Sequence, residues 1–169
     1  MKLEVKPENR LNIRLDSFLN KNKKKLSPVG SVWVKLYAKR KGYIGVTRPH
    51  IRVTTASSIS SIHMQHGRRK PGSYFTNINK NENHYLSLVN QENKTNSFPI
   101  IIEGQSEKNQ VFNISLLPYA AELINLTALK NKAKLRGENL FFKFNHYGIL
   151  RRNILIQDSK SNVISIDHI

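Results

Sequence analysis

The chain contains no cysteine and few carboxylates. Its 169 residues include 11 Asp and Glu against 28 Lys and Arg. Without cysteine there are no disulfide bonds, no thiolate zinc sites and no cysteine nucleophiles. The acidic residues are also dispersed along the sequence, whereas two-metal nucleases and polymerases need carboxylates that converge on magnesium. We therefore expect no metal ion and no cofactor, and an enzyme is the less favoured class.

Long apolar segments are missing as well. No stretch approaches eighteen uninterrupted apolar residues, and the opening residues MKLEVKPE carry a charge at every second position. The sequence therefore predicts neither a membrane span nor a secretory signal. The corresponding expectations are a location in the cytoplasm or an organelle matrix and no membrane partner. A hydrophobic content of 38% suffices for a single core, which predicts one domain over 1–169.

Positive charge is what the sequence has in excess. The formal net charge is +17 and the isoelectric point is near 10.3. Residues 1–70 hold 17 Lys and Arg against three acids, a net +14, whereas residues 71–169 hold 11 against eight, a net +3. Such a surplus is typical of proteins that bind nucleic acid, which supplies one negative charge at each phosphate. Its segregation predicts one binding side, in the first part of the chain.

The basic residues of this first part gather into three clusters beside turn-forming residues. Glycine and proline next to each cluster predict loops, from which Lys and Arg side chains can reach phosphates. For any single cluster, a solvated run of charge is the alternative interpretation. The clusters are Lys21, Lys23, Lys24 and Lys25; Lys39, Arg40 and Lys41; and Arg68, Arg69 and Lys70.

One segment predicts a strand with a basic, aromatic face. In residues 31–39, SVWVKLYAK, small apolar residues alternate with aromatic and basic ones, and a period of two is typical of a strand. Unpaired bases stack on aromatic rings beside basic grooves, although an aromatic residue on a strand can simply be packed. The candidate nucleic-acid-binding residues outside the clusters are Trp33, Lys35, Tyr37, Tyr43, Arg48, Arg52 and Tyr74.

The rest of the chain predicts a mainly β (α+β) fold. We expect an antiparallel sheet, or a sandwich-like or barrel-like domain, with basic loops. One longer helix is expected near 118–135, with Pro118 in its first turn, cations near its C-terminal end, which the helix dipole explains, and Gly137 after it. Further strands are expected over 11–15, 43–47, 51–55, 84–89, 99–103, 110–116, 139–144, 153–157 and 162–166.

Two pairs of these strands predict hairpins, and two segments predict loops. The hairpins join 99–103 to 110–116 and 153–157 to 162–166. Residues 20–28 and 65–83 are polar and basic, with Asn, Gly and Pro. Segments of this composition often become ordered only on a partner, so we expect a basic extension or flexible loops there.

These features predict a non-catalytic nucleic-acid-binding protein. The favoured form is an RNA-binding subunit of a ribonucleoprotein complex, ribosomal or RNA-guided, with other protein subunits as partners. RNA is favoured over DNA because no segment resembles a recognition helix for the major groove.

Two alternatives stay open. One is a metal-independent ribonuclease, which needs only a general base, a general acid and a cation at the phosphate. Its candidate residues are His50, His63 and His66, with Tyr43 or Tyr74 nearby. The other alternative is a β-rich structural subunit of a phage particle or of a secretion or conjugation assembly.

Overall fold

The computed structural model describes Ser17 and residues 50–63, 72–104, 109–135, 139–144 and 151–168. Contacts within the chain group it into two units, Met1–Gly30 and Ser31–Ile169. Apart from Ser17, all described residues belong to the second unit. The strands expected over 11–15, 31–39 and 43–47 and the basic segment 20–28 lie outside the described residues. One domain over 1–169 stays a prediction.

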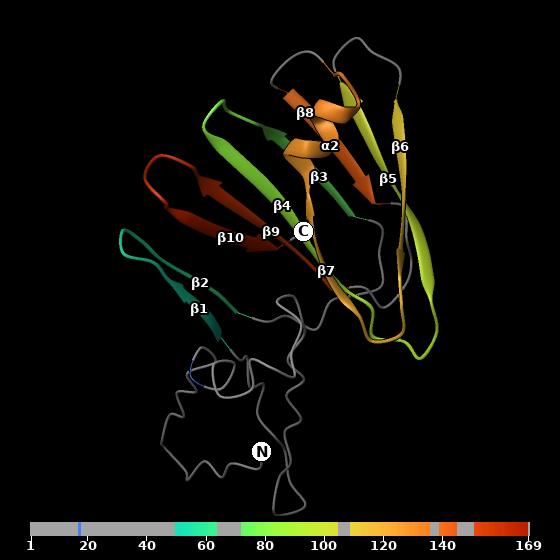
Figure 1. Ribbon diagram of the computed structural model, residues 1–169, viewed down its shortest axis with the longest axis horizontal. Helices are drawn as coiled ribbons and strands as arrows, with labels where there is room; N and C mark the ends of the chain where they lie inside the picture. Colours follow the sequence, from blue (N-terminus) through green and yellow to red (C-terminus); the bar gives the residue numbers. More distant parts are fainter. Residues whose placement is uncertain are drawn as a thin grey trace, which may run out of the picture. The chain divides into compact units, whose positions relative to one another are not determined.

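Two antiparallel four-stranded sheets make up most of the described chain (Figure 1). Sheet I has the order β10-β9-β4-β7 and sheet II the order β3-β8-β5-β6. Neither closes into a barrel, and the expected mainly β fold with antiparallel sheets is confirmed. Sheet I consists of β4 (Glu82–Val89), β7 (Ala121–Asn125), β9 (Arg151–Asp158) and β10 (Ile164–His168). Sheet II consists of β3 (Gly72–Asn77), β5 (Asn96–Gly104), β6 (Gln110–Leu116) and β8 (Asn139–Phe144). Before these strands in the sequence, β1 (His50–Thr54) and β2 (Ile59–His63) form a separate hairpin.

The chain passes repeatedly from one sheet to the other. The connections β3 to β4, β4 to β5, β6 to β7, β7 to β8 and β8 to β9 each change sheet. Only β5–β6 and β9–β10 are hairpins within one sheet, and both were expected from the sequence. Neither sheet can therefore be completed from one continuous segment, so the two sheets depend on each other.

Alternating apolar residues join the sheets into one core. Leu86 and Leu88 of β4 are fully buried, as are Ile100 and Ile102 of β5 and Phe142 of β8. All five belong to a single buried cluster that draws on both sheets. Each fully buried side chain of this kind stabilises the fold by about 1.5–3 kcal/mol relative to an exposed one. The period-two pattern read from the sequence is thus the pattern that forms the sandwich.

The helix is shorter than predicted. Among the described residues of this unit, the one helix is α2, Leu126–Lys132, and the expectation of a helix over 118–135 was wrong in its first part. Ala121–Asn125 forms β7 instead, because it pairs in full with β4, and such pairing overrides local helix propensity. The side-chain Oδ1 of Asn125 then caps α2 by accepting a hydrogen bond from the N–H of Ala128 at 2.8 Å.

A left-handed residue ends the helix earlier than expected. Lys134 has a φ of 55°. Its N–H donates to the carbonyl of Asn131, and the N–H of Leu135 donates to the carbonyl of Lys130. This is the hydrogen-bond pattern of a Schellman motif, in which the left-handed position is usually glycine. The sequence pointed to Gly137 as the end because a lysine carries no signal for this conformation.

Most of the other strand predictions within the described residues are confirmed, but β2 and β3 were not predicted. The serine-rich sequence ISSIH of β2 carries a weak strand signal. β3 lies within 65–83, which the composition predicted to be a loop. Its six residues pair in full with β8, so main-chain pairing rather than composition determines the conformation of 72–77.

A buried asparagine joins two turns at one end of the sandwich. The side chain of Asn90 is fully buried. Its Nδ2 donates to the carbonyl oxygens of Lys94, Leu116 and Leu117 at 2.8, 3.2 and 2.9 Å. Its Oδ1 accepts from Nδ2 of Asn96 at 2.9 Å. The turn between β4 and β5 is thereby fixed to the turn between β6 and β7.

Replacement of Asn90 by leucine removes the hydrogen bonds to the carbonyls of Lys94, Leu116 and Leu117, of which the bond to Leu116 is buried, and leaves Asn96 with Glu92 as its acceptor. We expect Asn90→Leu to lower the free energy of unfolding by about 3 kcal/mol, measured by urea denaturation. Asn93 is exposed in the same turn, so Asn93→Leu should change it by less than about 0.5 kcal/mol. Equal losses in the two variants would contradict the role of Asn90 in joining the turns.

Candidate functional site

Two of the predicted nucleic-acid-binding residues lie among the described residues. Arg52 is exposed on β1, and Tyr74 is half-buried on β3. For the other candidates, a role in nucleic-acid binding stays a prediction. The candidates outside the described residues are Lys21, Lys23, Lys24, Lys25, Trp33, Lys35, Tyr37, Lys39, Arg40, Lys41, Tyr43, Arg48, Arg68, Arg69 and Lys70.

Hydroxyl groups close the turn of the hairpin that carries Arg52. The N–H of Thr55 donates to the carbonyl of Ser58 at 2.9 Å. The Oγ1 of Thr55 accepts from the N–H groups of Ser57 and Ser58 at 3.3 and 3.0 Å. Serine and threonine favour turns of this kind because their hydroxyls bond to the nearby main chain. This turn determines which residues of β1 and β2 lie opposite one another.

The same hairpin binds to the outer edge of sheet I through serine side chains. The N–H groups of Ile164 and Ile166 on β10 donate to Oγ of Ser58 and Ser60, both at 3.1 Å. In addition, Oγ of Ser57 donates to the carbonyl of Ser161 at 2.6 Å. An edge strand otherwise offers its N–H groups to other chains. The hairpin therefore protects the β10 edge.

The register of this hairpin pairs two of the ribonuclease candidates. The Cα atoms of His50 and His63 are cross-strand partners, and so are those of Arg52 and Ser61, two positions along. Alternate pairs of an antiparallel hairpin share a face. The register thus assigns two histidine positions and one cationic position to the same face. His66, the third candidate histidine, lies outside the described residues.

A buried histidine on β4 has polar partners at both ring nitrogens. His84 is 1% exposed. Its Nε2 lies 3.2 Å from Oε2 of Glu82, and its Nδ1 lies 3.1 Å from the hydroxyl of Tyr74 and 3.3 Å from Oγ1 of Thr76. Since an ionised carboxylate only accepts hydrogen bonds, we assign the ring proton to Nε2, and Nδ1 then accepts from the Tyr74 hydroxyl.

The ionisation states of the two neighbours agree with this assignment. The hydrogen bond with Asn79, and to a smaller extent that with His84, lowers the pKa of Glu82 below its ordinary value. Burial raises the pKa of Tyr74, which the negative charges of Glu82 and Asp167 reinforce. At neutral pH Glu82 is therefore a carboxylate and Tyr74 a phenol that can donate a hydrogen bond.

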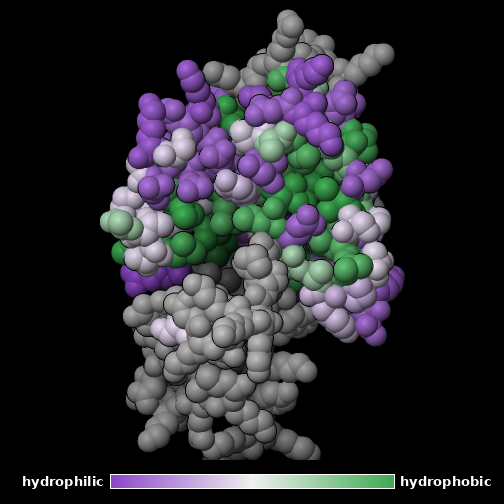
Figure 2. Space-filling model, viewed as in Figure 1, coloured by the Kyte–Doolittle hydropathy of each residue, from purple (hydrophilic) through white to green (hydrophobic). Residues whose placement is uncertain are grey.

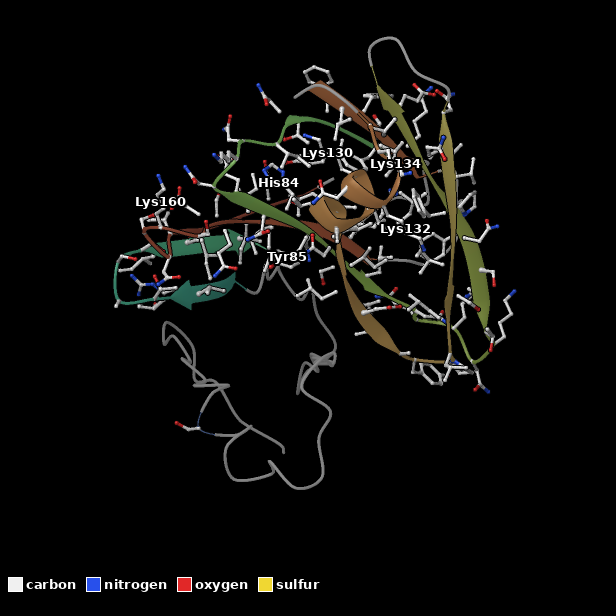
Figure 3. All side chains as sticks on the ribbon, turned by 45° about the horizontal axis from the view of Figure 1, so that its top comes forward. His84, Tyr85, Lys130, Lys132, Lys134 and Lys160 are labelled. Carbon is white, nitrogen blue, oxygen red and sulfur yellow. The ribbon has the colours of Figure 1, made fainter. Side chains whose placement is uncertain are left out.

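This cluster links the two sheets. Tyr74 and Thr76 belong to sheet II, whereas His84 belongs to sheet I, and the main-chain N–H of His84 donates to Oγ1 of Thr127 on α2 at 3.0 Å. Figure 3 shows His84 beside that helix. The ring of Tyr74 lies 6.3 Å from the ring of Phe142 and packs against the core. Tyr74 thus contacts Phe142 within sheet II and His84 of sheet I, and base stacking on its ring stays a prediction.

Three lysines surround the C-terminal end of α2 (Figure 3). Lys130 and Lys132 lie in its last turn, where the helix dipole favours cations as expected from the sequence, and Lys134 follows the helix. Within the described part of the chain, no carboxylate forms an ion pair with any of them. The Nζ of Lys132 lies 6.0 Å from the centre of the Phe112 ring. These lysines add positive charge to the surface without belonging to residues 1–70.

Comparison of the chain with protein-family models, curated proteins and solved structures gave no match. In the described ranges, no three His, Asp or Glu side chains lie close enough together to hold a metal ion. No helix in those ranges is long and apolar enough to cross a bilayer. The proposed function therefore rests on the charge distribution of the chain, on the strand register and on the described side-chain contacts.

The hydrogen bonds to Glu82 predict a pH dependence of stability. Because its pKa in the folded state lies below the ordinary value of 4.5, the carboxylate stabilises the fold above that pH. This stabilisation of the folded state is lost as the pH falls from 4.5 through the folded-state pKa of Glu82. We expect Glu82→Gln to be less stable than the wild type near neutral pH, and the difference in urea midpoint to shrink towards about pH 3.

Glu122 offers a matched control for this measurement. Its side chain is exposed on β7, and no hydrogen bond or ion pair joins its carboxylate to a described residue. Glu122→Gln should therefore differ little from the wild type at either pH. If the urea midpoint of Glu82→Gln lies below that of the wild type by the same amount at both pH values, the charge of Glu82 does not contribute to stability.

Proposed function

We propose that the protein binds nucleic acid, with RNA as the favoured ligand, through the basic surface of residues 1–70. The observation that carries the proposal is the segregation of charge, since +14 of the formal +17 belongs to these residues. Cations that contact phosphates release the counterions condensed on the polymer, and this release drives binding. A ribonucleoprotein complex with other protein subunits is the favoured setting.

The two parts of the chain differ in how far their charge can be compensated. In residues 71–169 the acids are nearly as numerous as the cations, and some are paired: Lys94 with Glu92 at 3.3 Å and Lys143 with Glu103 at 2.6 Å. In residues 1–70, pairing of all three acids would still leave 14 cations without a local carboxylate. A polyanion supplies the missing counter-charge.

The described helix does not suit recognition of DNA by a helix. A protein that reads the major groove often inserts an α-helix. In the described part of the second unit, α2 has only seven residues and is anchored to the core by the buried Leu126. Such a helix is too short and too tightly attached to act as a recognition helix. Basic loops with aromatic residues suit single-stranded or folded RNA better.

The salt dependence of binding tests the proposal. Replacing Lys39, Arg40 and Lys41 together by glutamine removes three phosphate contacts in our proposal. The slope of log affinity against log salt for a labelled single-stranded RNA should then fall by about 2, because each contact contributes about 0.7. The measurement is fluorescence anisotropy of the full chain over a salt titration.

The lysines around α2 provide a control with the same change in net charge. Replacing Lys130, Lys132 and Lys134 by glutamine also removes three charges, but at positions that we do not assign to the RNA. The slope should change by less than about 0.7 in this variant. Equal changes in the two variants would show that only total charge matters, and an unchanged slope in the first would refute the assignment of that cluster.

A metal-independent ribonuclease is a second candidate, favoured by one observation. His50 and His63 are cross-strand partners in the β1–β2 hairpin, and Arg52 occupies the next position on the same face. Two histidines acting as base and acid, with a cation for the phosphate, suffice for cleavage through the 2′-hydroxyl. These three residues belong to residues 1–70, which we propose to bind RNA.

Histidine substitutions distinguish cleavage from binding. If the second candidate is correct, His50→Ala or His63→Ala should reduce the rate of RNA cleavage in the presence of a chelator at least about 100-fold, with the anisotropy affinity unchanged. His146→Ala, at a histidine outside the β1–β2 hairpin, serves as the control. Absence of cleavage by the wild type, or equal rates in all three variants, would eliminate the ribonuclease.

A further inference from the structure

One segment of this highly charged protein is almost uncharged. Residues 109–125 contain a single Asp, Glu, Lys or Arg, which is Glu122, although these four residue types make up 23% of the chain. The segment forms β6, the turn after it and β7. These two strands are the neighbouring edges of sheet II and sheet I. The lack of charge therefore falls on one side of the sandwich.

The same segment exposes apolar side chains. Seven large apolar side chains stand exposed among the described residues, and four of them belong to this segment: Val111, Leu117, Tyr119 and Leu123, between 42% and 67% exposed. Figure 2 shows apolar surface over β6 and β7, to the right of the centre of the view. A concentration of this kind is typical of a surface that contacts another molecule.

Among the described strands, β6 has a neighbour on one side only. β6 pairs with β5 on one side, and no hydrogen bond joins its other side to a described strand. Its sequence, QVFNISL, has no charge and no proline, the two features that usually prevent edge strands from pairing with other chains. The β10 edge, by contrast, is protected by Ser58 and Ser60 of the β1–β2 hairpin.

The turn next to this edge has a fixed backbone. Tyr119 adopts a φ of 54°, in the left-handed region that is uncommon for residues other than glycine. Its N–H donates to the carbonyl of Glu92 at 3.2 Å, and the carbonyl of Ala120 accepts from the N–H of Asn90 at 2.9 Å. The exposed side chains of Leu117 and Tyr119 are thus presented on a turn that needs little ordering before it makes a contact.

We propose that β6 pairs antiparallel with β6 of a second copy of this chain, so that two copies of sheet II form one continuous sheet. A two-fold interface brings the same surface of each copy together, and β6 is suited to this because it contains no charge that would repel its counterpart. Nucleic acid or an anionic membrane would select cations instead, and residues 109–125 have none. The two-fold axis lies near Asn113, the middle residue of β6.

Such a dimer has a consequence for RNA binding, which rests on the function proposed above. Two basic surfaces in one particle would bind one RNA with an affinity higher than that of a single surface, because the second contact becomes intramolecular. The dimer itself depends only on β6 and its neighbours. Its test can therefore be made without nucleic acid.

Sedimentation equilibrium of the full chain measures the dimer, after nuclease and high salt have removed nucleic acid and the protein has been returned to about 0.15 M salt, where like charges still repel. We expect the wild type to reach twice its 19.5 kDa mass within a range of about 5–200 μM, which covers typical weak-to-moderate dimers. Asn113→Lys places like charges opposite each other at the two-fold axis and should raise the dissociation constant at least about tenfold. Ser115→Lys, also exposed on β6, should act in the same direction.

Asn93→Lys is the matched control. It adds the same charge at an exposed position in the turn between β4 and β5 and should leave the dimer unchanged. A monomeric wild type at the highest concentration would overturn the proposal, as would equal weakening by Asn93→Lys and Asn113→Lys. A dimer broken by Phe75→Lys on β3 and not by Asn113→Lys would also overturn it, because the interface would then lie at the other edge of sheet II.

Discussion

The buried contact between the two sheets is the interaction on which the described structure depends. Leu86 and Leu88 of sheet I share one core with Ile100, Ile102 and Phe142 of sheet II. Because the chain changes sheet at most of its connections, loss of this contact would separate segments that are neighbours in sequence as well as in space. The polar contacts around Asn90 and His84 add to this core by joining turns and strands of the two sheets.

The division of charge follows from the same architecture. The described part of the sandwich has nine Lys and Arg against six Asp and Glu, and some of these form ion pairs. The excess of cations belongs to residues 1–70, where a partner can neutralise it. Uncharged surface is concentrated on β6 and β7. The proposed RNA contact and the proposed contact between copies therefore use chemically different parts of the chain.

Much of the fold could be predicted from the sequence, because period-two burial sets both the strands and the core. The failures have local causes. β7 was expected to be helical because its alanine and Ile124 suit either structure, and only pairing with β4 decides between them. The candidate site was less predictable. Glu82 lies two residues from His84 on the same strand, but Tyr74 and Thr76 reach His84 only because the two sheets pack together. The pairing of His50 with His63 depends on the turn at Thr55.

Purification of the full chain from an expression host, at low salt and without nuclease, tests the central claim of nucleic-acid binding most directly. We expect nucleic acid to accompany the protein, giving more absorbance at 260 than at 280 nm, and high salt to remove it, because the contacts are ionic. A protein that is free of nucleic acid at low salt, and then fails to bind added single-stranded RNA in the same buffer, would contradict the claim.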